Sequence, residues 1–189
     1  MLVPVTLGRT ISFGGGGNSF GSEADFAFEE ILYYSFQVTI QSWTCQRIGG
    51  GAYGTGAYGT IAAFLQDLQA GTLKPTTGAL PNSGGSDGPF DIVVRRPCFV
   101  VVRLSSDDDS TLCFQNDPLQ TQDPHQQDYR GLNPAYTDAD GRTRVIYFAV
   151  PAPRPSGDDS YNLYVQYGDG AASHPIAVHT IDPKIKNRG

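Results

Sequence analysis

The chain has 189 residues and a formal net charge of -6 at pH 7, with 13 Lys or Arg against 19 Asp or Glu. This length can bury one hydrophobic core without disulfides, so we predict a single domain spanning 1–189. Because nucleic acids and anionic membranes are bound mainly through clustered Lys and Arg, the acidic balance excludes both as partners.

The composition also predicts the kind of fold. Gly and Pro are abundant, at 23 and 13 residues, and the acidic residues are almost all Asp, which favours turns over helices. Such a composition is typical of a β-rich protein with long loops. The start has neither the basic head nor the apolar run of a secretory signal, and no segment is long enough to span a bilayer. We therefore expect cytoplasmic residence, with export by a leaderless route as the alternative.

Apolar periodicity predicts about seven or eight strands. Residues 31–43 alternate apolar and polar side chains from Tyr34 onward, as in a strand with one buried face. Residues 91–104 are nearly continuously apolar, and Pro97 within them predicts a core strand preceded by an irregular or edge strand that is broken at the proline. The other candidate strands are 3–7, 11–13, 24–28, 144–152, 161–168 and 174–183.

Only residues 60–71 have helical spacing, with apolar side chains at i, i+3, i+4 and i+7 and Gly71 as the C-terminal cap. The long stretches 72–90 and 115–142 are rich in Gly, Pro and polar residues and are predicted to be irregular. The sequence therefore predicts an all-β fold, an immunoglobulin-like or jelly-roll β-sandwich with one short helix and long loops.

The three cysteines, Cys45, Cys98 and Cys113, do not have the spacing of a metal site. Cys98 and Cys113 lie in apolar runs, where reduced thiols pack as small hydrophobic groups. We expect buried thiols, and a bridge between Cys98 and Cys113 is the alternative in an oxidising compartment.

The segment 49–60, GGGAYGTGAYGT, satisfies the G-x-G-x-x-G pattern twice, between a strand and a helix. A dinucleotide site also requires a parallel strand soon after the helix, and here 72–90 follows instead. We interpret the segment as a mobile loop. Its tyrosines, Tyr53 and Tyr58, either present their rings to a partner or sugar or fold back onto the sandwich.

Residue types suggest two candidate binding sites, one for a sugar and one for calcium. Sugar recognition uses stacking rings and planar hydrogen-bonding groups, and the candidates are Trp43, Tyr53, Tyr58, Asn133 and Tyr136. Calcium prefers carboxylate oxygens, and Asp138 and Asp140 in TDADGRT resemble part of a calcium loop, with 107–109 as a source of further oxygens.

Evidence for catalysis is sparse. The chain has 3 histidines, none of them in a metalloprotease or serine-hydrolase motif. His125, with Asp123 and Asp128 nearby in sequence, is the basis for a hydrolase alternative. No catalytic residue and no cofactor is assigned, with calcium as the one candidate ion.

The C-terminal sequence Ile181, Asp182, Pro183, Lys184, Ile185, Lys186, Asn187 resembles the ending of the small bacterial DP-EP family, in which a strand runs into I-D-P-x-I-x-N. The resemblance covers about the last forty residues. It implies an immunoglobulin-like sandwich of unassigned biochemical role, and it transfers no catalytic residue.

These features favour a non-enzymatic binding or self-assembly module, and we expect a homo-oligomer. In the assembly version, the Gly-rich arm 1–20 hinges at Gly14 to Gly17 and adds to a neighbour's sheet edge. The basic tail 184–189 follows a strand that stops at Pro183, and it is either loose or an intersubunit latch. The alternatives are a carbohydrate- or small-ligand-binding protein, with or without calcium, and a hydrolase.

Overall fold

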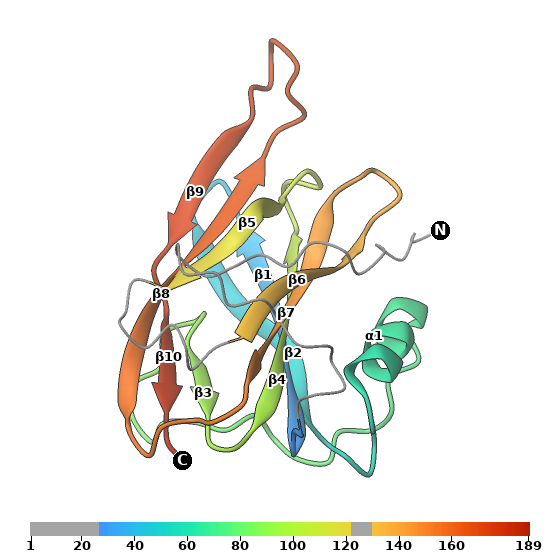
Figure 1. Cartoon of the computed structure of the whole chain (residues 1–189). Helices are drawn as coiled ribbons and strands as arrows, with labels where there is room; N and C mark the ends of the chain where they lie inside the picture. Colours follow the sequence, from blue (N-terminus) through green and yellow to red (C-terminus); the bar gives the residue numbers. More distant parts are fainter. Residues whose placement is uncertain (1–26, 122–129) are drawn as a thin grey trace.

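The computed structural model describes residues 27–121 and 130–189. These residues form an all-β sandwich of two sheets with one short helix, which confirms the predicted fold class (Figure 1). The described residues contain ten strands rather than seven or eight. The candidate strands 3–7 and 11–13, the arm 1–20 and His125 with its neighbours Asp123 and Asp128 lie outside them. The elements are β1 (Glu30–Thr39), β2 (Thr44–Gly54), α1 (Ile61–Ala70), β3 (Ile92–Val94), β4 (Cys98–Ser106), β5 (Cys113–Thr121), β6 (Arg130–Thr137), β7 (Thr143–Val150), β8 (Gly157–Tyr167), β9 (Ala177–Ile181) and β10 (Lys184–Asn187).

The strands divide into two sheets. The first has the order β2-β1-β4-β7-β6, and the second has the order β3-β10-β8-β5 with β9 also paired to β8. The two strands predicted around Pro97 are β3 and β4, and they lie in different sheets. β2 and β3, on either side of α1, also lie in different sheets, so the Gly-rich segment is not part of a βαβ unit.

Two hydrophobic cores stabilise this arrangement. The larger core fills the space between the sheets, and the smaller one lies between the first sheet and α1. β1 contributes to both, with Tyr34 and Phe36 in the larger core and Ile31 and Tyr33 in the smaller. From Tyr34 onward the predicted apolar face is buried, at Tyr34, Phe36 and Val38, while Gln37 and Thr39 on the other face are half-buried. Before Tyr34, α1 and its neighbours cover the second face of β1 as well.

The helix begins and ends where the sequence predicts. The Thr60 side chain accepts a hydrogen bond from the Ala63 backbone at 3.2 Å, as an N-cap does. Gly71 adopts the left-handed conformation with φ 71°, which glycine adopts without steric cost. The buried side chains of α1 are Ile61, Phe64 and Leu68.

The stretch 115–142, predicted to be irregular, contains most of β5 and all of β6. The register of β5 with β8 shifts between Phe114 and Leu119, and Pro118 lies within this strand. The register of β6 with β7 shifts at three places. Strands with such register shifts do not have to alternate apolar and polar side chains along their length. That alternation was the signal used to predict strands, so β5 and β6 were missed.

Candidate functional site

The structure separates the residues predicted to bind a sugar. Tyr53 is 4% exposed and Tyr58 is 1% exposed, and both rings pack with Phe64 in the smaller core. The Tyr58 hydroxyl donates to Asp67 at 3.0 Å and accepts from the Lys74 backbone at 2.8 Å. Of the two alternatives, the rings fold back onto the sandwich. The mobile-loop interpretation was also wrong for residues 49–54, which belong to β2.

The other three candidates are also spread over the molecule. Trp43 lies in the turn between β1 and β2, whereas Asn133 and Tyr136 belong to β6. β2, which follows Trp43, and β6 are the opposite edges of the first sheet. The five predicted residues therefore do not form one stacking site.

The aspartates predicted to bind calcium are paired with arginines instead. Asp138 contacts Arg144, and Asp140 lies 2.7 Å from Arg142 and 3.1 Å from Arg144. Desolvation raises the pKa of Asp140, but hydrogen bonds from Arg142 outweigh this effect and leave the pKa below its usual value. No group of three or more His, Cys, Asp or Glu side chains within 27–121 and 130–189 is arranged to hold a metal ion.

The segment 107–109, the proposed source of further calcium ligands, instead connects two loops. Asp108 accepts hydrogen bonds from the backbones of Ile40 and Gln41 at 2.8 and 2.9 Å. These bonds lower the pKa of Asp108. Asp107 accepts from the Thr39 hydroxyl at 3.1 Å. The β4–β5 loop thus fixes the β1–β2 turn, which carries Trp43.

β8, β9 and the turn between them form the most prominent feature of the molecule, a hairpin that rises beyond the sandwich (Figure 1). Its first strand is β8, and the returning chain pairs with the same side of β8 twice. β9 pairs with Leu163 to Tyr167, and β10 pairs with Gly157 to Ser160. At the Asp182–Pro183 junction, the Pro183 carbonyl accepts from the Tyr161 backbone at 3.1 Å.

The tail 184–189 was therefore predicted incorrectly, because its first four residues form β10 within the second sheet. β10 pairs with β8 on one side and, in parallel, with β3 on the other. Ile185 is fully buried, and Lys186 and Asn187 are buried as well. Pro183 does not end the strand pairing but joins two strands.

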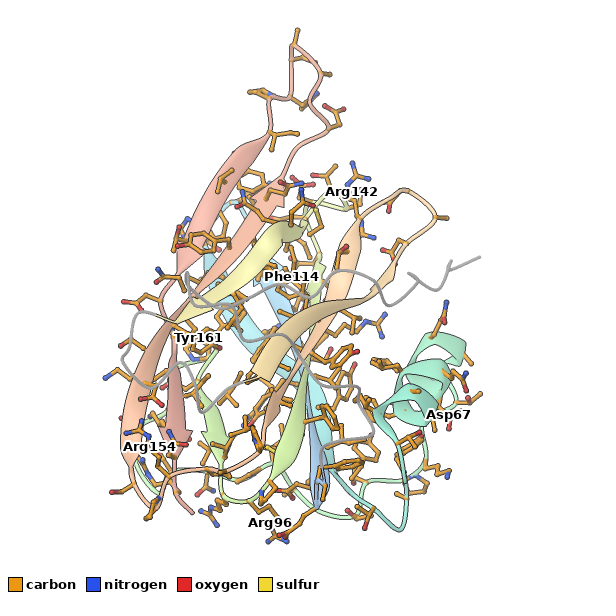
Figure 2. The ribbon with its side chains drawn as sticks, viewed as in Figure 1. Asp67, Arg96, Phe114, Arg142, Arg154 and Tyr161 are labelled. Carbon is orange, nitrogen blue, oxygen red and sulfur yellow. The ribbon has the colours of Figure 1, made fainter. Side chains whose placement is uncertain are left out.

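The buried polar residues of β10 all have partners. Lys186 Nζ lies 2.8 Å from Asp87 Oδ1 and 3.1 Å from Asp91 Oδ2, and we call these three residues the lysine cluster. The Asn187 amide donates to Asp159 at 3.1 Å, and Asp159 also contacts Arg154. Figure 2 shows Arg154 at the same end of the molecule as β10, whereas Arg142, between β6 and β7 of the first sheet, lies toward the end from which the hairpin rises. Asp159 is thus a buried carboxylate within β8.

β9 differs from β10 because β3 does not extend alongside it. Its only strand partner among the described residues is β8, so its outer edge is open. Val178 in β9 is 57% exposed, and Ile176 just before it is 54% exposed. The segment 171–181 contains no Asp, Glu, Lys or Arg. We call the outer side of β9 the open edge.

The inner face of β9 is fixed by aromatic rings. His179 stacks on Trp43, with ring centroids 3.6 Å apart and planes at 19°. Tyr167 packs against the edge of the same indole at 5.6 Å. Trp43 has φ 50°, a strained conformation for a bulky residue, and these ring contacts help to hold it. The open edge is therefore supported by the sandwich beneath it.

The hairpin turn also has a specific backbone geometry. Gly168 has φ 97°, and a Cβ at this position would lie 2.5 Å from the Pro175 carbonyl oxygen, so only glycine fits. The Gly168 backbone donates to the Thr111 hydroxyl at 2.5 Å, which joins the hairpin to the β4–β5 loop. Asp169 caps the turn by accepting a hydrogen bond from the Ala171 backbone at 2.9 Å, as Asp side chains commonly do in turns.

Residue types gave no direct indication of this site. The strand 174–183 was predicted, but its position at a sheet edge depends on which distant segment pairs beside it. The usable signal was the absence of charge in 171–181, since edge strands usually carry charged residues or prolines that prevent further pairing.

All three cysteines are free thiols, and Cys98 and Cys113 are buried. Burial raises the pKa of the Cys98 and Cys45 thiols, that of Cys45 to about 12, so both are protonated at neutral pH. Within the described part of the chain, the model has no helix with the length and apolar character of a membrane span. No protein-family model and no curated protein sequence matches this chain.

Proposed function

We propose that the protein is a non-enzymatic self-assembly module that associates through the open edge of β9. The observation that supports this proposal best is that, among the described residues, no strand pairs with the outer side of β9, where the surface is exposed and contains no Asp, Glu, Lys or Arg. An edge of this kind is a template for an added strand. The rigid support from Trp43 lowers the entropy lost when another strand pairs with it.

The assembly surface differs from the one suggested by the sequence. The arm 1–20 lies outside the described residues, and the tail 184–189 is largely occupied by β10. Self-association through β9 requires neither of them. Deletion of residues 1–17 therefore separates the two versions: assembly through β9 survives the deletion, whereas assembly through the arm does not.

Light scattering over a range of protein concentrations tests the proposal, with Val178→Lys as the decisive variant. The added charge must be desolvated when another strand pairs beside it, so we expect the variant to stay monomeric where the unaltered chain associates. Ile48→Lys is the matched control, because Ile48 is 52% exposed on β2, an edge of the other sheet. We expect this control to associate normally. An unaltered chain that is monomeric throughout would refute the proposal.

We also propose the family relationship suggested by the C-terminal sequence. The residues that resemble the DP-EP ending build the last residue of β9, the Asp182–Pro183 junction and β10. Members of that family should then place the Lys and Asn of the motif inside a sheet, as Lys186 and Asn187 are placed here. A crystal structure of a member in which this ending is detached from the sheets would contradict the relationship.

A further inference from the structure

We infer that the partner of β9 is β9 of a second copy, paired antiparallel across a two-fold axis that passes beside His179. This inference rests on the proposed self-assembly and specifies its geometry. Such an interface is isologous, so it closes at two copies and does not continue into a fibre.

The choice of partner follows from the other sheet edges. β2 carries Arg47 at a register break, since Ser35 pairs with Gly49 while Phe36 pairs with Arg47. β5 contains Pro118 and a register shift, and the register of β6 shifts three times. β3 has only three residues. Each feature discourages strand addition. β9 pairs with β8 without a register shift and has none of these features.

Charge supports the same choice. Two copies that each carry a formal net charge of -6 repel one another, and the repulsion is smallest where no charged side chain lies between them. The segment 171–181 satisfies this condition.

Pairing all five residues of β9 fixes the register. With the axis beside His179, Val178 lies opposite Thr180 of the second copy, and Ala177 lies opposite Ile181. Val178 and Thr180 are both exposed in the single chain and share one face of β9. β-Branched residues directly opposite each other stabilise antiparallel pairs, and this register forms two such Val–Thr pairs. The interface is small, so the dimer should be weak and dependent on concentration.

Disulfide trapping tests this register. Residues directly opposite have Cβ atoms about 4.5–5.5 Å apart, within reach of a disulfide, whereas diagonal neighbours about 7–8 Å apart are too distant. We therefore expect a mixture of Val178→Cys and Thr180→Cys chains to form a cross-linked dimer under mild oxidation. Each variant alone should give at least tenfold less. The unaltered chain, with its three native thiols, measures the background.

The outcomes separate the two proposals. Efficient cross-linking of Val178→Cys with itself would overturn this register. A mixture that gives only background cross-linking, while light scattering shows association, would overturn β9–β9 pairing and leave self-assembly standing. A chain that is monomeric at every concentration would overturn both. A mixture of Ile48→Cys and Thr180→Cys should stay at background, and strong cross-linking there would show that β9 pairs with β2 instead.

Discussion

β9 and β10 are consecutive strands on the same side of β8, yet they have opposite surroundings. β3 pairs with the outer side of β10, and Ile185 and Asn187 are fully buried there. β9 has no such neighbour among the described residues, and Val178 is largely exposed. The comparison shows that the same hairpin is part of the core in one half and a free surface in the other. We therefore expect β10 to contribute to the folding stability of the chain and β9 to mediate its self-association.

The largest effect should come from removing a buried side chain of β10. Replacing Ile185 by Ala deletes fully buried methylene and methyl groups, which should lower the free energy of unfolding by about 2–5 kcal/mol. The matched variant in the other half is Ile176→Ala, where the side chain is more than half exposed. That variant should change stability by less than about 0.5 kcal/mol. Urea unfolding measures the free energy of unfolding of both variants. Equal losses would contradict the expected difference between β10 and the segment before β9.

The lysine cluster should give the next largest effect. Lys186→Met keeps the apolar stem but leaves the carboxylates of Asp87 and Asp91 without their shared cation, at a cost of about 1–3 kcal/mol. Lys184→Met in the same strand is the control, because it removes the same charge from an exposed position. We expect a change of about 0.5 kcal/mol or less for this control. A loss as large as that of Lys186→Met would mean that net charge, not the cluster, is responsible.

The same cluster makes stability depend on pH. Desolvation raises the pKa values of Asp87 and Asp91, but hydrogen bonds, including those from Lys186, outweigh it and leave both lowered. Groups with lowered folded-state pKa values stabilise the protein above about pH 4 and lose this contribution as pH falls through the lowered values. Hydrogen bonding to Asp87 raises the pKa of Lys186, so its contribution persists below about pH 10 and disappears as pH rises through the raised value.

We therefore expect the stability difference between the unaltered chain and Lys186→Met to be largest between about pH 5 and pH 9 and to shrink at about pH 3. Urea midpoints at pH 7 and pH 3 measure it. Lys184→Met should show little of this dependence, since the substitution removes an exposed side chain and keeps the Lys184 backbone N–H, which donates to Asp91 at 3.0 Å. A difference that stays constant between the two pH values would show that the cluster is not the cause.

These contrasts also mark what the sequence could predict. The strands with strong apolar patterns were located correctly, as was α1, because Thr60, Gly71 and the apolar spacing of α1 are local signals. The burial of β10 was missed because its four residues include two lysines, which normally indicate a solvated tail. Lys186 is accommodated by aspartates about one hundred positions earlier in the chain, and no local pattern reports such a partner.

The candidate binding residues were harder to predict than the fold, because their contacts with the rest of the chain are not visible in the sequence. Tyr53, Tyr58 and Asp140 were chosen because their side chains suit sugar or calcium, but chemical type does not report whether a side chain is already engaged. The tyrosines are covered by α1, and the aspartate is neutralised by Arg142. The open edge arises in the opposite way, because β3 ends before it can cover β9. The open edge therefore depends on long-range strand pairing, which no local pattern reports.

The smallest expected effect concerns Val178 within a single chain. Because its side chain is largely exposed and faces away from the aromatic support of β9, Val178→Lys should change the unfolding free energy of the monomer by less than about 0.5 kcal/mol. Urea unfolding at a concentration where the chain is monomeric measures this value. A loss above about 1 kcal/mol would show that Val178 packs within its own chain. Loss of association by this variant would then reflect a damaged hairpin, and only the cysteine pairs would test strand addition at β9.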